Sequence, residues 1–390
     1  MKRTRYLALL LLAVLLLNAG AMAACTDPST RTLCDDEGHD YNTTDWAYDV
    51  TAHYHKCNRD GCTAKIDWSE HDSDEECGKC GYKRSVYSKE YAREGNAVTF
   101  GSYPQSQVED AELIASLNEL AGEQAAEADR ISWIAYPYYK NGEQADFMWY
   151  QDVTYENNRY RGVYFSEYRP HHTSYDSSAN VSNQDDNGYT ADEVYWFKYE
   201  PIRWTILEWA GDKVLLLCNT ILDAQTYQNA ASLPSSIPTN EYASSTIRAW
   251  LNNDFLNTAF TSAQKLLIAE TELDNSKNTA GVSPSGDHTY SSSKDRVFLP
   301  SYADVTNSEY GFASDENRRK LTTDYAQMQG AYTAREGDFA GMGWWWLRSY
   351  SDNASDAVRV VYYKGGIGTQ GADVRGTDEG VVPALWLKIN

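Results

Sequence analysis

The chain has little of what several classes of protein require. Basic residues are scarce: 34 Lys and Arg stand against 56 Asp and Glu in 390 residues, for a net charge of −22. Such a chain repels phosphate backbones and anionic membrane surfaces, so we expect no nucleic-acid partner. The sequence also has no Gly-x-Ser-x-Gly, no phosphate-binding loop and no His-Glu-x-x-His. It therefore predicts neither an enzyme nor a catalytic cofactor.

Cysteine is nearly missing after residue 80. Only Cys218 follows, within an apolar run that predicts a buried strand, and it is expected to act as a small buried hydrophobe. The other six cysteines precede residue 81, and four form two close pairs: Cys57, Cys62, Cys77 and Cys80. This spacing predicts a structural zinc site with no open coordination position, or alternatively two disulfides. Nearby histidines could replace one ligand: His53, His55 and His71.

Long apolar runs are confined to the amino terminus. Residues 1–24 are predicted to be a signal peptide, with a basic start and an apolar stretch, residues 7–17, too short to span a bilayer. Cleavage removes three positive charges, giving −22 − 3 = −25. Because Cys25 follows at once, the segment also resembles a lipobox. The protein is thus expected outside the cell, secreted or anchored at the bacterial surface, with membrane contact only through a lipid on Cys25.

The remaining chain divides by composition. Residues 25–50 are polar and acidic and indicate a linker, in which Cys25 and Cys34 could form a disulfide if Cys25 carries no lipid. Residues 51–84 hold the paired cysteines, and a large domain is expected from residue 98 to residue 390. Its first strand should end at Pro104, and a helix should follow Asp110. Residues 171–190 are rich in Ser, Asn and Asp and predict a solvated loop.

Periodicity predicts further elements. Ile202, Trp204 and Ile206 alternate as in a half-buried strand, followed by a turn at residues 211–212. Two helices are expected after caps at Ser244 or Ser245 and at Thr261. The last eighth carries four tryptophans, a hairpin with a glycine turn at residues 364–366, and a final strand at residues 383–387. This stretch needs a core that only the earlier chain can supply.

Aromatic residues are abundant, with 30 tyrosines and 12 tryptophans, and such side chains suit binding surfaces as well as cores. Trp345 and Trp346 are expected in the core, and Arg348 is as suited to a structural ion pair as to a ligand. The candidate ligand-binding residues combine ring faces with directional hydrogen-bonding groups: Trp344, Arg348, Tyr350, Asp352, Asn353, Asp356, Tyr362, Tyr363, Gln370, Asp373 and Arg375.

Five motifs in order carry a resemblance: residues 100–105 (FGSYPQ), 199–204 (YEPIRW), 245–252 (STIRAWLN), 345–349 (WWLRS) and 383–387 (PALWL). Residues 98–390 resemble a family of uncharacterised extracellular domains of gut Firmicutes. They are similar, more distantly, to the C-type-lectin-like fold, which includes formylglycine-generating oxidases. That resemblance implies an α+β domain of twisted antiparallel sheets with two helices, long loops bearing the ligand site, and paired first and last strands. Residues 51–84 resemble small zinc-ribbon-like modules of exported proteins.

These features favour a binding protein that recognises a glycan or a protein ligand through loops of the large domain. A structural adhesion protein without glycan binding is the main alternative. An oxidase of the formylglycine-generating type is less supported, because Cys218 has no cysteine partner in the domain. The signatures of calcium-dependent sugar binding are missing from the sequence. The family's usual Gly-Val-Arg-Pro-Ala is Gly-Val-Val-Pro-Ala at residues 380–384, so any contact made through that arginine is lost.

Overall fold

A computed structural model describes most of the chain, and the account below is confined to these residues: 38–48, 52–59, 62, 64–70, 79–80, 97–122, 133–136, 139–140, 143–144, 147–169, 183–229, 239–283, 289–351, 355–368 and 370–389. The chain forms two compact units, residues 1–85 and 86–390. The predicted signal peptide, Cys25, Cys34 and Cys77 lie outside the described residues. Among the helices that are described, none has the length and apolar character needed to cross a membrane.

The amino-terminal unit contains a three-stranded antiparallel sheet, β1 (Ala47–Tyr48), β2 (Ala52–Lys56) and β3 (Lys65–Glu70). β1 and a bridge between Tyr41 and Cys57 bring residues from before position 50 into this unit. The sequence assigns those residues to a linker. The difference arises because β2 offers a free strand edge, which a short polar segment can fill through backbone hydrogen bonds alone.

The large unit is α+β with mainly antiparallel sheets, as the sequence predicts, and is organised around one long strand, β10 (Val194–Ala210). One edge of β10 pairs with β4 (Ala97–Gln107). The other edge pairs first with β9 (Asn158–Phe165) and then with β11 (Lys213–Cys218). The expected period-two face of β10 is confirmed, since Ile202, Trp204 and Ile206 are all buried.

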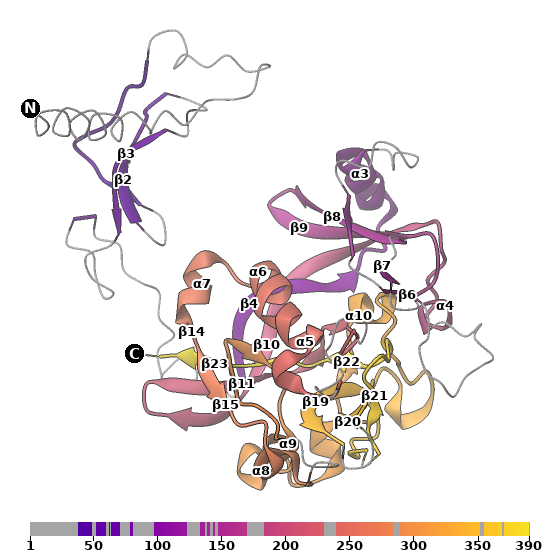
Figure 1. The fold of residues 1–390 in the computed structure, drawn as a ribbon. Coiled ribbons are helices and arrows are strands. Elements are labelled where there is room, and N and C mark those ends of the chain that lie inside the picture. The colour runs from indigo at the N-terminus through magenta and orange to yellow at the C-terminus, as the bar shows by residue number, and fades with distance from the viewer. Residues whose placement is uncertain are drawn as a thin grey trace, which may run out of the picture. The chain divides into compact units, whose positions relative to one another are not determined.

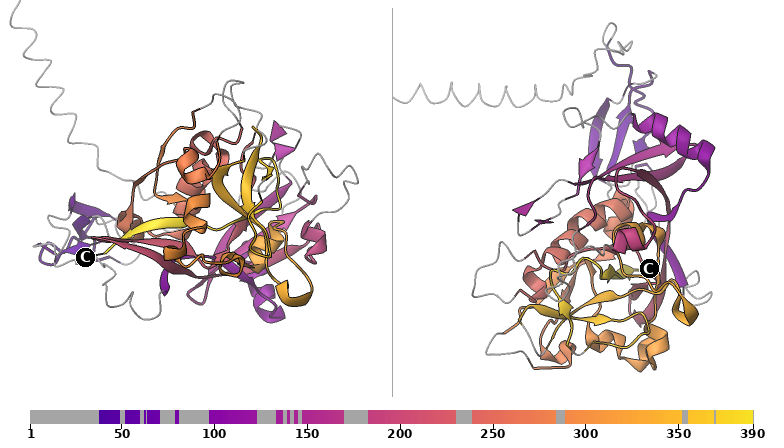
Figure 2. Two further views of the ribbon diagram at one scale, coloured as in Figure 1. Left: turned by 90° about the horizontal axis from the view of Figure 1, so that it is seen from below. Right: turned by 90° about the vertical axis from the view of Figure 1, so that its right-hand side faces the viewer.

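The final strand, β23 (Ala384–Lys388), lies inside the sheet built by earlier segments, as expected. It pairs with β11 on one edge and with β14 (Ile268–Ala269) and β17 (Val297–Phe298) on the other. In the left view of Figure 2 it lies apart from the other carboxy-terminal strands, which share its yellow colour. Cys218 in β11 is fully buried, and burial raises the pKa of its thiol, which agrees with its expected role as a small hydrophobe.

The other carboxy-terminal strands form a second sheet in the order β13 (Asp223–Ala224), β22 (Gly380–Val381), β19 (Trp345–Tyr350), β20 (Ala357–Val361) and β21 (Ala372–Asp373). Every residue of β19 is buried. The expected core positions of Trp345 and Trp346 are confirmed, and their indole N–H groups donate to the carbonyls of Arg318 and Gln225. After β20 the chain reverses at residues 362–366, and an antiparallel bridge between Val361 and Ile367 closes this turn.

The predicted helices are present with the expected caps. α5 (Thr246–Trp250), the π-helical turn η4 (Leu251–Phe255) and α6 (Leu256–Ala259) run continuously, and Ser245 caps their start. α7 (Ser262–Leu267) begins with the capping box of Thr261 and Gln264. α3 (Ala111–Ala121), capped by Asp110, lies beside β8 (Met148–Tyr155) and β9, away from the other helices (Figure 1).

The remaining elements are short. They are β5 (Ile134–Ala135), β6 (Tyr139–Lys140), β7 (Glu143–Gln144), α4 (Asn183–Asp186), β12 (Thr220–Ile221), η3 (Tyr242–Ser244), β15 (Thr271–Leu273), α8 (Lys277–Ala280), β16 (Ser293–Asp295), α9 (Tyr302–Val305), η5 (Ser308–Tyr310), η6 (Asp315–Arg318), β18 (Leu321–Thr322), α10 (Asp324–Met328) and η7 (Gly337–Phe339).

Three expectations for the large unit differ from the structure. β4 continues through Pro104, because β10 is its sole partner among the described strands and an edge strand tolerates a residue without an N–H. Part of the predicted solvated loop is instead the turn α4, whose Gln184 is fully buried and donates to the carbonyl of Met328 at 2.7 Å. The first and last strands of the large unit, β4 and β23, do not pair, because β10 and β11 lie between them.

Buried polar contacts join the first half of the large unit to the second. The Tyr103 hydroxyl donates to Asp223 Oδ2 at 2.6 Å. Arg169 Nη1 donates to the carbonyls of Ala224 and Gln329 at 2.6 and 2.7 Å. Folding removes each of these donors and acceptors from water. Such a pair therefore stabilises the fold only while both partners are present, because removal of one leaves the other buried without a hydrogen bond. Residues on both sides of position 210 therefore belong to one structure.

Asp223 should make the stability of the large unit depend on pH. Burial raises the pKa of its carboxyl to about 6, whereas an unfolded Asp titrates near pH ~4. Between these values only the native state holds the proton, so this group's stabilising contribution is lost as pH rises through about 6. Relative to wild type, the unfolding free energy of Asp223→Asn should rise by about 2–3 kcal/mol from pH ~4 to ~7. Urea unfolding of both proteins at several pH values measures this difference; a difference independent of pH would contradict it.

Candidate functional site

Three of the expected ligand-binding residues lie together on the large unit. Tyr362 meets Trp344 edge-on with ring centroids 5.3 Å apart, and Trp344 stacks on Tyr332 at 4.5 Å. Tyr332 in turn contacts Tyr363, which contacts Phe339, both at 5.8 Å. All five rings are partly exposed. We call this chain of rings the aromatic surface: Tyr332, Phe339, Trp344, Tyr362 and Tyr363.

Separate segments position these rings. Trp344 directly precedes the buried strand β19, while Tyr362 and Tyr363 follow β20, the antiparallel partner of β19. Tyr332 lies in the segment after α10, where its backbone N–H donates to the carbonyl of Asp378 at 2.7 Å. The pairing of β19 with β20 fixes the positions of Trp344, Tyr362 and Tyr363, and the bond to Asp378 fixes Tyr332. The spacing of these rings is therefore set before a ligand binds.

Cations border one end of the aromatic surface. The Arg319 guanidinium lies 5.0 Å from the Phe339 ring centroid, and Lys364 Nζ lies 5.4 Å from that of Tyr363. Arg319 is also paired with Glu316 at 3.6 Å. Cation–π contacts of this kind hold exposed rings in place.

A cavity of ≈ 330 Å³ adjoins the middle of the aromatic surface at Tyr332, which belongs to both. Its remaining lining is polar: Asp186, Asn187, Thr333, Arg335 and Glu336. Arg335 is paired with Asp186 at 2.6 Å. The Asn187 amide donates to the carbonyls of Gln327 and Ala331 at 2.9 and 3.0 Å, which holds its oxygen in a fixed position. The volume lies within the range of small-molecule sites, about 300–1,000 Å³.

Two buried polar groups lie at the aromatic surface or next to it: Trp344 belongs to it, and Glu379 precedes Gly380, whose N–H donates to the carbonyl of Trp344 at 2.8 Å. Trp344 Nε1 and Glu379 Oε2 have no hydrogen-bond partner among the residues that the structure describes. Burial and the neighbouring Asp378 hold the pKa of the Glu379 carboxyl well above its usual range.

The other expected ligand-binding residues lie elsewhere. Arg348 is buried and pairs with Asp304 at 2.8 Å, which confirms the structural ion pair. Tyr350 is buried, stacked on Tyr290 at 3.8 Å. Arg375 forms a two-pronged ion pair with Asp373, next to the exposed Asp356. Gln370 is exposed, and Asp352 and Asn353 lie outside the described residues.

Sequence reasoning missed several members of this site. Asp186 and Asn187 come from the predicted solvated loop, and Tyr332, Phe339 and the other cavity-lining residues come from a stretch to which the sequence analysis assigns no helix or strand. No periodicity marks them, because they are brought together only by the pairing of β19 with β20 and by the turn after α10. The excess of tyrosine was the one available signal.

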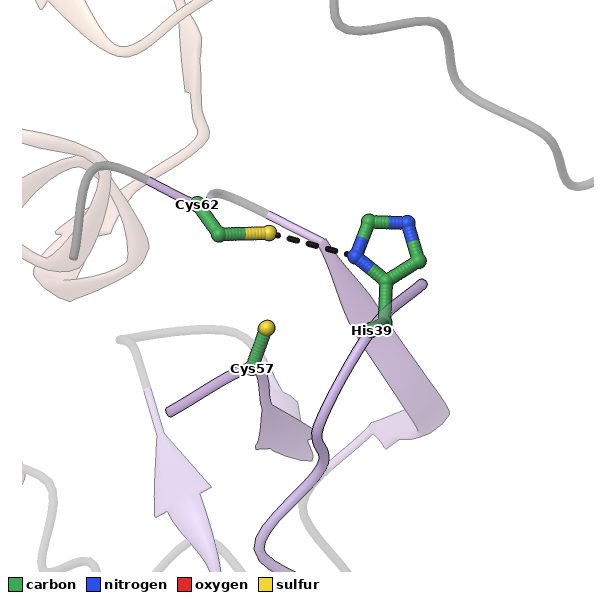
Figure 3. A group of neighbouring side chains, drawn as sticks. All are labelled: His39, Cys57 and Cys62. Atoms are coloured by element: carbon green, nitrogen blue, oxygen red, sulfur yellow. Dashed lines mark hydrogen bonds between the residues drawn. The ribbon is translucent and has the colours of Figure 1, made fainter. Parts of the chain in front are cut away.

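The amino-terminal unit holds a second candidate site. His39 Nδ1 lies 3.3 Å from Cys62 Sγ, and Cys57 Sγ completes a group in which all ligand atoms lie within 4.8 Å of one another (Figure 3). Burial raises the pKa of the Cys57 thiol, but hydrogen bonds from the backbone at Arg59 and Asp40 and from His39 and Cys62 outweigh this and lower the pKa to about 6. Cys80, the other described cysteine of the expected set, is not part of this group.

Residues 211–389 match a family model described as a domain of unknown function (DUF6273). The match covers a little less than half of the chain and is consistent with the resemblance to an uncharacterised family. No curated protein and no solved structure shows a detectable match to the chain. The matched segment begins at Gly211, in the turn between β10 and β11, so it cuts the central hairpin of the large unit.

Proposed function

We propose that the protein is an exported binding protein that holds a glycan on the aromatic surface of its large unit. The observation that carries this proposal is the continuity between five partly exposed rings and a polar cavity, with Tyr332 in both. Stacked sugars need ring faces, and their hydroxyls need fixed donors and acceptors beside those faces. The aromatic surface and the cavity supply these two requirements side by side.

The charges of the site favour an uncharged sugar. Arg335 is paired with Asp186 and Arg319 with Glu316, so their side chains act as directional hydrogen-bonding groups more than as free charges. The two other charged side chains of the site, Lys364 and Glu336, have opposite signs. A protein ligand is the alternative, and an experiment must distinguish it from a glycan. An interface with a protein would use the same rings but needs about 600 Å² or more on each partner.

Three further parts of the proposal come from the sequence. Residues 1–24 direct export, with secretion or a lipid on Cys25 as the two outcomes. The large unit is a C-type-lectin-like domain. The helices at residues 246–267 and the final strand inside the sheet support this, whereas β4 and β23 do not, because they do not pair with each other. The paired cysteines hold a structural zinc. The buried Cys218 lends no support to the oxidase alternative.

A glycan array probed with the purified chain tests the proposal. Tyr332→Ala should weaken binding of any sugar found by at least about tenfold, because an aromatic at the centre of a site contributes about 2 kcal/mol or more. Raising the salt from about 50 to 300 mM should change the affinity by less than about twofold if the sugar is uncharged.

Trp209→Ala is the matched control, since Trp209 is an exposed aromatic on β10 outside the aromatic surface. This variant should bind like wild type. Thermal unfolding of each variant shows that it is folded. If no sugar binds on the array, or if both variants lose affinity equally, the hypothesis of glycan binding at the aromatic surface is wrong. The adhesion protein without glycan binding would then be the remaining alternative.

A further inference from the structure

The fold of the amino-terminal unit brings three metal-ligating atoms together from separate segments. Asn58 N–H donates to the carbonyl of Asp40 at 2.7 Å, which places His39 beside the end of β2. Cys57 follows β2 directly, and Cys62 N–H donates to the carbonyl of Arg59 at 3.1 Å, closing a turn that returns the second thiol. Backbone contacts therefore set the positions of His39, Cys57 and Cys62.

The distances suit a tetrahedral ion. With bonds of about 2.3 Å to sulfur and about 2.0–2.1 Å to nitrogen, ligand atoms around zinc lie about 3.5–3.8 Å apart. In the structure all three atoms lie within 4.8 Å of one another, and His39 Nδ1 is 3.3 Å from Cys62 Sγ (Figure 3). Thiolate and imidazole together prefer zinc over the hard cations calcium and magnesium.

The other described histidines of this unit are engaged elsewhere. His53 Nε2 lies 2.9 Å from Ser69 Oγ, and its ring meets Trp46 edge-on. His55 Nδ1 lies 3.1 Å from the carbonyl of Asp45, and its ring stacks on Trp46 at 4.0 Å. Both were sequence candidates for a ligand. Their contacts hold them in the small core around Trp46, whereas the His39 ring faces the two thiols.

We propose that His39 Nδ1 binds zinc together with Cys57 Sγ and Cys62 Sγ, making a mixed imidazole–thiolate site in place of the expected four-cysteine site. This inference rests on the proposed structural zinc and names a ligand that the cysteine spacing does not show. Because His39 precedes β1, the ion would tie the segment before residue 48 to Cys57 and Cys62. The expected linker would then be part of the metal-dependent unit.

Metal analysis of the purified full chain, followed by replacement of zinc with Co²⁺, tests the assignment. The intensity of thiolate-to-cobalt charge transfer counts the thiolates, and no more than three are expected. His39→Ala should lower zinc affinity by at least tenfold. His39→Cys should keep the metal and add one thiolate to the count. His71→Ala is the matched control, because His71 is the third histidine that the sequence analysis names as a possible metal ligand. This variant should bind zinc like wild type.

The outcomes separate the two proposals. A wild-type chain that holds no zinc, with its cysteines in disulfides, overturns the structural zinc itself. A chain that holds zinc through four thiolates, or that keeps its affinity in His39→Ala, overturns only the assignment of His39. If His71→Ala loses zinc and His39→Ala does not, the imidazole ligand is His71, and the assignment of His39 is overturned.

Discussion

A fragment of residues 211–390, which contains the whole segment that matches the family model, should not fold alone. It begins at the turn between β10 and β11 and so leaves β11 without the partner that pairs with it from Lys213 to Cys218. It also removes fully or nearly fully buried apolar side chains that share one core with the retained part, among them Val98, Phe100, Phe165, Phe197, Ile202 and Trp204.

The expected loss exceeds the stability of an ordinary domain. Each fully buried large apolar side chain contributes about 1.5–3 kcal/mol, and a domain is stable by only about 5–15 kcal/mol. Tyr103 is also lost, so the buried Oδ2 of Asp223 no longer receives the hydrogen bond of the Tyr103 hydroxyl. Near-ultraviolet circular dichroism and urea unfolding should show no cooperative transition for the fragment. Residues 86–390 are the control and should unfold cooperatively.

Cooperative unfolding of the 211–390 fragment would show that residues 97–210 are an accessory to a self-sufficient domain. That result would contradict the single core described above. It would also mean that the segment matching the family model can fold without strands equivalent to β4 and β10.

Replacement of Arg161 should be among the most destabilising single changes in the large unit. Its guanidinium is buried and binds both carboxylate oxygens of Asp152, at 2.8 and 2.9 Å. It also donates to the Tyr325 hydroxyl at 3.4 Å and lies 4.2 Å from the Tyr150 ring centroid. Arg161→Met keeps the bulk and removes the charge. It should cost about 3 kcal/mol, the lower end of the range for breaking a buried pair, because Asp152 keeps its second partner, Arg159, at 2.6 Å.

A double-mutant cycle with Asp152→Asn identifies the cause. Burial raises the pKa of the Asp152 carboxyl, but Arg161 and Arg159 outweigh burial and hold it below its usual range, so the partner is ionised. The double variant should therefore be less destabilised than the sum of the single variants, with a coupling of about 0.5–3 kcal/mol in the unfolding free energy. Strict additivity would mean that the pair contributes nothing beyond packing.

Local patterns made much of the fold predictable. Alternation at Ile202, Trp204 and Ile206 identifies the buried face of β10, since successive side chains of a strand point to opposite sides. The caps at Ser245 and Thr261 mark the helix starts, because their side chains satisfy backbone N–H groups that no helical carbonyl reaches. Both signals depend only on residues close together in the sequence.

Strand order was not predictable in the same way. β10 is long enough to pair with β4, β9 and β11, and no local pattern states which strand takes which edge. Pro104 illustrates the limit: it ends most strands, but the open edge of β4 tolerates it. His39 and Tyr332 were missed for the same reason, because each joins its site through a backbone contact with a distant segment, at Asn58 and Asp378 respectively.

Hydrogen exchange of the protein with and without a bound glycan tests the site assignment most directly. With the sugar selected on the array, protection should appear in peptides covering residues 331–344 and 361–368, which carry the aromatic surface, and in residues 183–188 beside the cavity. Peptides from β8 and β9, residues 148–165, should exchange unchanged. Protection confined to β8 and β9, or to the amino-terminal unit, would place the ligand elsewhere and contradict the account.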